Sequence, residues 1–192
     1  MGVPNGLTML RVLLIPVMVV FFVLPVGWGE PAAAVVFVLA ALTDWFDGFL
    51  ARRLEQGSRF GAFLDPVADK LLVTTALVLL VMANGHFWVA LPALFIIGRE
   101  IAVSALREWM AQIGASRAVA VSRIGKVKTA VQMVAIVCML YAHPIGGVPI
   151  YLIGLALLYL AAALTLFSMY MYLEAARPEL GRRRTSRKNS EL

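Results

Sequence analysis

Six apolar runs constrain this chain more than any other feature, because all but the short fifth run are close to the length that crosses a lipid bilayer. They occupy residues 7–26, 31–51, 63–83, 87–106, 127–141 and 148–172. A bilayer core about 30 Å thick requires about 20 apolar residues in a helix. Hydrophobic residues make up 61% of the chain, against about 45–50% in a soluble domain. The sequence therefore predicts an integral membrane protein.

The predicted fold class is all-α, a bundle of six transmembrane helices. Helices are expected because lipid offers no hydrogen-bond partners to an open backbone, and the short alternating strands of a barrel are not seen. The first run lacks a clear cleavage site, so we interpret it as a retained helix rather than a signal peptide. We expect residues 1–176 to form one membrane domain and residues 177–192 to form a basic, poorly ordered tail.

The 17 Lys and Arg residues predict the orientation of the bundle. The links 24–31, 84–87 and 143–149 contain none of them, whereas the links 51–59 and 107–128 and the tail are basic. Because basic loops stay in the cytoplasm, we expect both termini to be cytoplasmic. The net charge of +6 follows from this bias and from attraction to anionic lipid, so no nucleic-acid partner is expected.

The chain has too few cysteine and histidine residues to build a catalytic or metal centre from them. Cys138 is the only cysteine, which excludes a disulfide or a cysteine metal cluster within one chain. His86 and His143 lie in short links, far along the chain from any aspartate. A Ser-His-Asp centre or a histidine metal centre therefore lacks its parts.

All four aspartates fall within one stretch, DWFDGFLARRLEQGSRFGAFLDPVADK, residues 44–70. Asp44 and Asp47 are three residues apart near the end of the second run, and Asp65 and Asp69 are four apart at the start of the third. Either spacing puts two side chains on one helix face. Because consecutive helices joined by a short loop are antiparallel neighbours, we expect the four carboxylates to converge at the cytoplasmic edge of the membrane.

Four converging carboxylates need positive charge between them. Oxygen ligands select hard cations such as Mg²⁺ or Mn²⁺, and two such ions about 3.5–4 Å apart commonly clamp a transferring phosphoryl group. The alternative is that the aspartates pair with nearby basic residues such as Arg52 and Lys70, which would account for one or two of them. Gly48 and Gly61 lie beside the acidic pairs, and close approach of a ligand would justify these helix-weakening residues.

The aspartates also carry a resemblance to a known family. Written with its spacing, the stretch reads Asp44-x2-Asp47-Gly48-x2-Ala51-Arg52-x8-Gly61-x3-Asp65-x3-Asp69. This pattern is similar to the signature of the CDP-alcohol phosphotransferase family in all eight fixed residues over 26 positions. The resemblance implies a six-helix membrane enzyme, usually dimeric, that displaces CMP from a CDP-linked alcohol with two divalent cations, Mg²⁺ or Mn²⁺. It also implies a bacterial inner membrane, with the active site facing the cytoplasm.

The resemblance implies roles for the residues at matching positions. The metal ligands are expected to be Asp44, Asp47, Asp65 and Asp69, of which Asp44 and Asp65 bridge both ions. Asp69 is also expected to be the catalytic base toward the acceptor hydroxyl. The expected contacts to the donor come from Asn5, Thr8, Gly48, Arg52, Ser58 and Gly61.

Three flanking stretches, PNGLTMLR (4–11), GREIAVSALREWMA (98–111) and IGKVKT (124–129), resemble family members whose acceptor is sn-glycerol 3-phosphate. They imply that CDP-diacylglycerol and glycerol 3-phosphate give phosphatidylglycerol phosphate and CMP, a step in acidic phospholipid synthesis. The phosphate of this acceptor needs several converging cations. The candidates are Arg99, Arg107, Arg117, Arg123, Lys126 and Lys128. For Arg99 the alternative is a buried pair with Glu100.

Three other functions stay open at this point. The first is the same reaction with serine, inositol or a phospholipid as acceptor, and a basic pocket is the feature that discriminates, since an uncharged alcohol would not need one. An aromatic prenyl transferase also holds Mg²⁺ with paired aspartates, but on widely separated helices, whereas 17 residues separate Asp47 from Asp65 here. A divalent-cation transporter predicts carboxylates near the middle of the membrane and internal repeats, and no repeat is seen.

Overall fold

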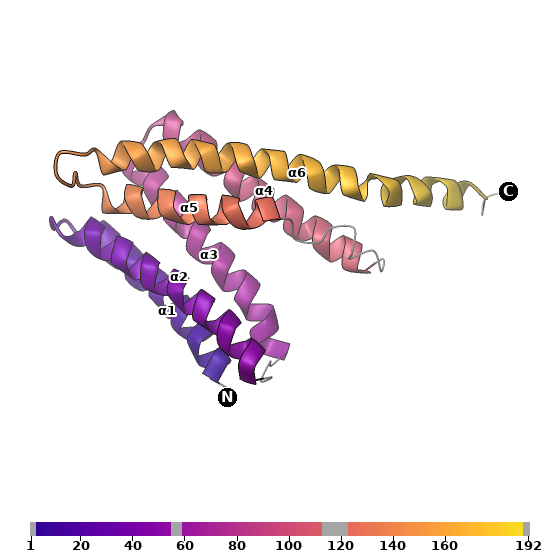
Figure 1. Cartoon of the computed structure of the whole chain (residues 1–192), viewed down its shortest axis with the longest axis horizontal. Coiled ribbons are helices and arrows are strands. Elements are labelled where there is room, and N and C mark those ends of the chain that lie inside the picture. Colours follow the sequence, from indigo (N-terminus) through magenta and orange to yellow (C-terminus); the bar gives the residue numbers. More distant parts are fainter. Residues whose placement is uncertain (1–2, 55–58, 113–122, 190–192) are drawn as a thin grey trace.

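The computed structural model describes the backbone of residues 3–54, 59–112 and 123–189, and the side chains of residues 6–43, 64–112 and 127–174 (Figure 1). Within this part of the chain there are six α-helices and no strand, which confirms the all-α prediction. The helices are α1 (Val3–Val23), α2 (Gly29–Leu54), α3 (Arg59–Asn84), α4 (Phe87–Gln112), α5 (Arg123–Tyr141) and α6 (Ile150–Asn189).

Each predicted apolar run corresponds to one helix, but several helices continue beyond their runs at the basic end. The fourth run was expected to end at residue 106, and α4 continues to Gln112. The sixth run was expected to end at residue 172, and the backbone of α6 is helical to Asn189. Hydropathy measures the apolar length of a helix, whereas charged residues of good helix propensity extend it into the interface. The disorder of the tail stays a prediction.

Four of these helices are long and apolar enough to cross a membrane over their described residues, namely α1, α3, α4 and α6. The described parts of α2 and α5 contribute shorter apolar segments, Gly29–Thr43 and Val127–Tyr141. Large apolar side chains also point outward, with Leu13, Met82 and Leu94 between 64% and 71% exposed. Such a continuous apolar exterior suits lipid rather than water. A membrane protein is thus supported, and the count of six spans stays a prediction.

The bundle is built from two helical hairpins with α3 between them. In Figure 1, α1 and α2 form one hairpin and α5 and α6 form the other, and these two pairs make the most extensive contacts. Helix α3 contacts α1, α2, α4 and α5, while α4 packs on α6. Met18, Phe37, Leu77, Ile136 and Leu158 are fully buried members of one apolar core that joins all these layers.

The α5–α6 hairpin depends on glycine in two places. Gly146 and Gly147 have φ values of +57° and +83°, and they form the two-residue turn inside a pair of backbone hydrogen bonds between Ile145 and Val148. Left-handed backbone in both turn residues favours glycine. On α6, a Cβ at Gly154 would lie 2.7 Å from the Met139 side chain on α5. Glycine therefore lets these two helices approach closely.

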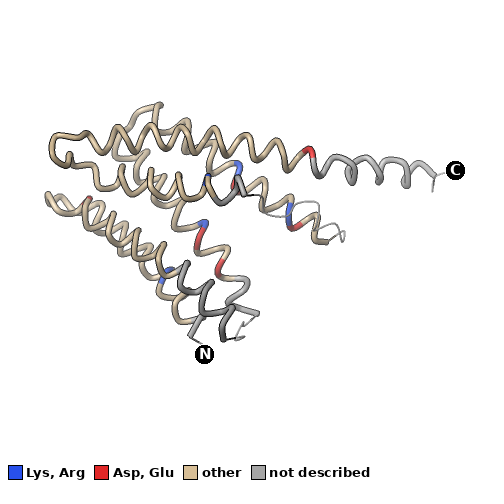
Figure 2. Tube along the Cα trace, in the orientation of Figure 1, with Lys and Arg blue, Asp and Glu red and all other residues tan. Residues whose placement is uncertain are grey.

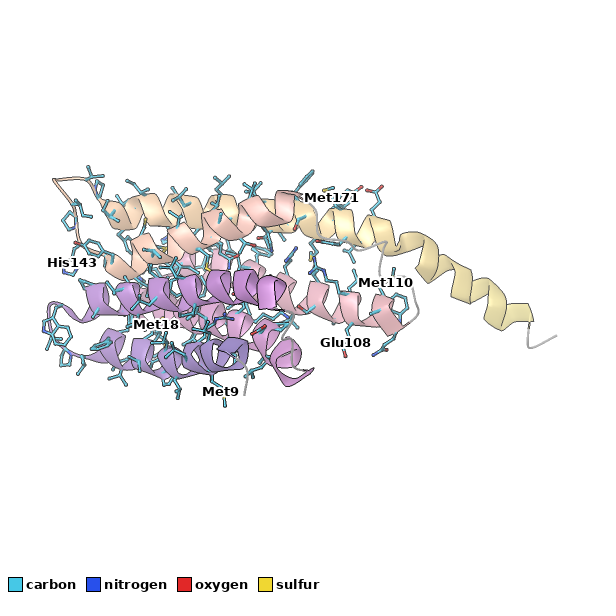
Figure 3. All side chains as sticks on the ribbon, turned by 60° about the horizontal axis from the view of Figure 1, so that its bottom comes forward. Met9, Met18, Glu108, Met110, His143 and Met171 are labelled. Atoms are coloured by element: carbon cyan, nitrogen blue, oxygen red, sulfur yellow. The ribbon has the colours of Figure 1, made fainter. Side chains whose placement is uncertain are left out.

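The two ends of the bundle differ in charge. Figure 2 shows the Lys and Arg segments in blue toward the chain's N-terminus and the last turns of α4, and none at the links that join α1 to α2, α3 to α4 and α5 to α6. In Figure 3, His143 marks this end without Lys or Arg, while Glu108 and Met110 mark the opposite one. We call the latter the basic end. This uneven distribution of Lys and Arg predicts that the basic end lies in the cytoplasm. The orientation stays a prediction.

Candidate active site

An acidic face lies on α3 at the basic end of the bundle. Asp65 and Asp69 are one helical turn apart and both are half-buried. The Thr8 hydroxyl of α1 donates a hydrogen bond to Oδ1 of Asp65 at 2.5 Å. Thr8 itself is 1% exposed, so its contact with Asp65 is shielded from solvent. Helix α1 therefore helps to orient the first carboxylate of the pair.

Most other residues of the predicted site lie outside the residues whose side chains are described. They are Asn5, Asp44, Asp47, Gly48, Arg52, Ser58, Gly61, Arg117, Arg123 and Lys126. Among the described residues, no group of three His, Cys, Asp or Glu side chains could hold a metal ion. Because the side chains of Asp44 and Asp47 are not among the described residues, the four-carboxylate centre stays a prediction.

The described part of the acidic face fits a hard divalent cation. Asp65 and Asp69 offer only oxygen donors, which suit Mg²⁺ or Mn²⁺, and the hydrogen bond from Thr8 is the kind of outer contact that orients a metal ligand. Helices α2 and α3 contact each other. The backbone of α2 carries Asp44 and Asp47 in its last turns, toward the connection into α3.

Replacing Thr8 with valine tests this support of Asp65. The variant keeps the shape of the side chain but removes the hydroxyl that donates to Asp65. Loss of such an outer contact typically weakens metal affinity by about 10–100-fold. We expect activity to need a correspondingly higher Mg²⁺ concentration, with most of the rate recovered at saturation, measured by metal titration of CMP release. A rate loss that Mg²⁺ cannot restore would show that Thr8 acts in another way.

A small pocket, with a cavity volume of about 40 Å³, opens beside Asp69 between α3, α4 and α5. Its polar lining comes from three helices, and its apolar lining includes Val73, Ile96 and Met133. The polar lining residues are Asp69, Lys70 and Thr74 of α3, Glu100 of α4, and Lys128, Thr129 and Gln132 of α5. The pocket thus brings a carboxylate of the acidic face together with a buried lysine, a pairing that suits an acceptor with a hydroxyl and an anionic group.

Two of the predicted phosphate-binding residues share one carboxylate at this pocket. Arg99 Nη1 donates to Glu100 Oε2 at 3.0 Å, and Lys128 Nζ lies 3.5 Å from the same oxygen. Arg99 Nη2 donates to the Ser168 hydroxyl on α6 at 2.9 Å. Arg99 and Lys128 are 6% and 5% exposed. Arg99 therefore pairs with Glu100, as the sequence offered as its alternative, although Glu100 itself is only half-buried, and Glu100 holds Lys128 next to it.

Arg107 lies further toward the C-terminal end of α4 than Arg99 and also contacts α6. Its Nη2 donates to the Tyr172 hydroxyl of α6 at 2.6 Å, and its guanidinium carbon lies 5.1 Å from the centre of the Tyr172 ring. The Arg99 guanidinium lies 5.7 Å from the same ring. Tyr172 thus orders both arginines on α4 from one side, which concentrates positive charge along α4 next to the pocket.

A buried hydrogen bond from Arg99 to Ser168 should stabilise the α4–α6 contact measurably. Ser168 is fully buried, so a Ser168→Ala variant leaves a buried guanidinium N–H without its acceptor. We expect the free energy of unfolding in detergent to fall by about 1–3 kcal/mol. The matched control is Ser104→Ala on α4, whose hydroxyl bonds only within its own helix. Equal stability of the two variants would contradict this role.

Some residues at this end were not singled out from the sequence. Arg11 is fully buried on α1, three residues after Thr8 and on the same helix face. An arginine inside an apolar run is a signal that intramembrane charge rules would have flagged. Ser168 and Tyr172 gave no such signal, because single polar residues are ordinary in apolar helices.

Comparison with known proteins bears directly on this site. The family model described as CDP-alcohol phosphatidyltransferase matches residues 1–167. A protein of Shigella flexneri serotype 5b and one of Escherichia coli K12 are each 56% identical to this chain over 179 residues, which is 93% of this chain and 97% of the relative. Both are named CDP-diacylglycerol–glycerol-3-phosphate 3-phosphatidyltransferase.

Proposed function

This chain belongs to the CDP-alcohol phosphatidyltransferase family, and on that premise we propose that it joins CDP-diacylglycerol to sn-glycerol 3-phosphate, giving phosphatidylglycerol phosphate and CMP. The names of relatives that match nearly the whole chain support this reaction. The structural observation that carries the proposal is the pocket shared by Asp69 and Lys128. Family membership removes the prenyl transferase and the cation transporter from consideration.

The reaction is a displacement at phosphorus. The primary hydroxyl oxygen of glycerol 3-phosphate attacks the phosphorus that carries the diacylglycerol ester, and the bond from this phosphorus to the CMP oxygen breaks. The proton of the attacking hydroxyl passes to Asp69, which lines the pocket and acts as the general base. CMP leaves with the electrons of the broken bond. Positioning of the two substrates contributes most to such transfers.

Divalent cations are the cofactors that this chemistry requires. Asp44, Asp47, Asp65 and Asp69 would hold them, as two ions of Mg²⁺ or Mn²⁺. When bound, such ions neutralise the charge of the phosphoryl group and make the leaving nucleotide a better leaving group. Thr8 holds Asp65 for this purpose. Asn5, Thr8, Gly48, Arg52, Ser58 and Gly61 are proposed to contact the nucleotide and diphosphate of the donor.

The acceptor phosphate is proposed to bind at the cations beside the pocket. Lys128 lines the pocket, and Arg99 is linked to it through Glu100. Arg107 adds charge on the same helix as Arg99. The remaining candidates are Arg123 and Lys126, in the first turn of α5. A charged phosphate makes stronger hydrogen bonds to such groups than a neutral alcohol would, which favours glycerol 3-phosphate over serine or inositol.

The setting of the enzyme completes the proposal. The proposed enzyme has six membrane spans in a bacterial inner membrane, with both termini and the basic end in the cytoplasm, where soluble glycerol 3-phosphate reaches the pocket. The diacylglycerol chains stay in the bilayer while the diphosphate reaches the membrane surface. Residues 1–176 form the membrane domain, residues 177–192 form a basic tail, and the enzyme works as a homodimer.

A panel of acceptors tests the proposed reaction. The purified protein is incubated with CDP-diacylglycerol, Mg²⁺ and one alcohol at a time, and CMP release is measured. We expect glycerol 3-phosphate to support a rate at least about 100-fold above serine or inositol, because those acceptors lack the phosphate that the cations beside the pocket are proposed to bind. If serine or inositol worked equally well, the acceptor would be wrong while the family would stand.

A further inference from the structure

Gln132 is an amide placed in the apolar part of α5. Its side chain is 5% exposed, and it lines the pocket beside Asp69. The amide is not among the fully enclosed polar groups that lack a partner in the described part of the chain, and it lines a pocket that a ligand can enter. An amide on the wall of a pocket can hydrogen-bond a ligand there, which an apolar residue at this position could not do. A ligand in the pocket is therefore a candidate partner for this amide.

The position of Gln132 on α5 suits a short acceptor molecule. Lys128, Thr129 and Gln132 all line the pocket, and their spacings of three and four residues put them on one face of the helix. Gln132 lies one turn beyond Lys128, about 6 Å along the helix axis, comparable with the span of a three-carbon chain. An acceptor whose phosphate contacts Lys128 can therefore reach Gln132 with its hydroxyl end.

The chemistry of the amide identifies the group it would bind. Glycerol 3-phosphate presents a phosphate, a primary hydroxyl that reacts and a secondary hydroxyl that does not. The phosphate is matched by cations and the reacting hydroxyl by Asp69. An amide both donates and accepts hydrogen bonds, as a neutral hydroxyl does. We propose that Gln132 hydrogen-bonds the secondary hydroxyl of the acceptor and so makes the enzyme select a glycerol backbone. This inference rests on the proposed function.

The test compares glycerol 3-phosphate with 3-hydroxypropyl phosphate, which lacks only the secondary hydroxyl. The wild-type protein is expected to show a kcat/KM about 10–100-fold lower with the deoxy acceptor, because the amide then loses its hydrogen bond to the acceptor. Gln132→Met replaces the amide with an apolar side chain of similar size. It should lower kcat/KM for glycerol 3-phosphate by about 10–100-fold and change that for the deoxy acceptor by less than about threefold, so that the preference disappears.

Gln112→Met is the matched control, since Gln112 is exposed at the end of α4. It should keep the wild-type preference. Activity of Gln132→Met with the deoxy acceptor also reports that the variant is folded. A Gln132→Met variant that keeps the preference, or that loses activity equally with both acceptors, would overturn the inference. So would a wild-type enzyme that uses both acceptors equally. A wild-type protein that releases no CMP with glycerol 3-phosphate would instead refute the proposed function.

Discussion

Asp69→Asn is expected to lower CMP release from CDP-diacylglycerol by about 10²–10⁴-fold, the contribution of a positioned general base. Asparagine has nearly the same shape as aspartate, but it cannot take the proton of the attacking hydroxyl. Asp69 lines the pocket and is half-buried on α3, so the substitution changes the chemistry at the pocket more than the packing of the helix. The initial rate at saturating concentrations of both substrates measures the effect.

Two controls separate lost catalysis from lost structure in this variant. The Asp69→Asn protein should insert, elute and bind CDP-diacylglycerol like the wild type. Glu108→Gln removes a carboxylate from the exposed side of α4 at the same end of the bundle (Figure 3), and it should keep the wild-type rate within about twofold. Full activity of Asp69→Asn would refute the role of Asp69 as the base.

Lys128→Met is expected to raise the KM for glycerol 3-phosphate by about 10–100-fold. Lys128 is 5% exposed and lines the pocket, and hydrogen bonds to charged groups contribute about 1.5–3 kcal/mol each. The carboxylate of Glu100 keeps its contact with Arg99 at 3.0 Å, so the variant does not leave a buried charge alone. Kinetics at a fixed, saturating donor concentration give the acceptor KM.

The donor provides the internal control for Lys128→Met. Because the lysine is proposed to bind only the acceptor phosphate, the KM for CDP-diacylglycerol should change by less than about twofold. An unchanged KM for glycerol 3-phosphate would remove Lys128 from the acceptor site. An equal rise in both KM values would mean that Lys128 supports the pocket as a whole.

The helices could be predicted from the sequence because the apolar residues of each helix are contiguous in the chain. The six apolar runs each correspond to one helix, and the spacing of Asp65 and Asp69 put them on one face of α3. Helix ends were less accurate, as α4 shows by continuing to Gln112. At those ends charged residues continue the helix beyond the apolar run, so hydropathy no longer measures helix length.

The contacts that shape the candidate site could not be predicted in the same way. Thr8 and Asp65 are 57 residues apart in sequence, and Arg99 and Ser168 are 69 apart. Such pairs depend on how helices rotate and slide against one another, and no local pattern records that. The sequence offered two alternatives for Arg99, a cation for the acceptor phosphate or a buried pair with Glu100, and its contact with Ser168 depends on how α6 packs against α4. Gln132 was overlooked because a single amide in an apolar run resembles ordinary helix packing.

Isotopic labelling of the acceptor tests most directly the central claim that its hydroxyl attacks the donor phosphorus. The purified protein receives CDP-diacylglycerol, Mg²⁺ and glycerol 3-phosphate with ¹⁸O in its primary hydroxyl, and mass spectrometry follows both products. The mechanism predicts that phosphatidylglycerol phosphate and CMP form one for one, with all the label in the lipid and none in CMP. Label in CMP, or an unlabelled lipid product, would contradict the account.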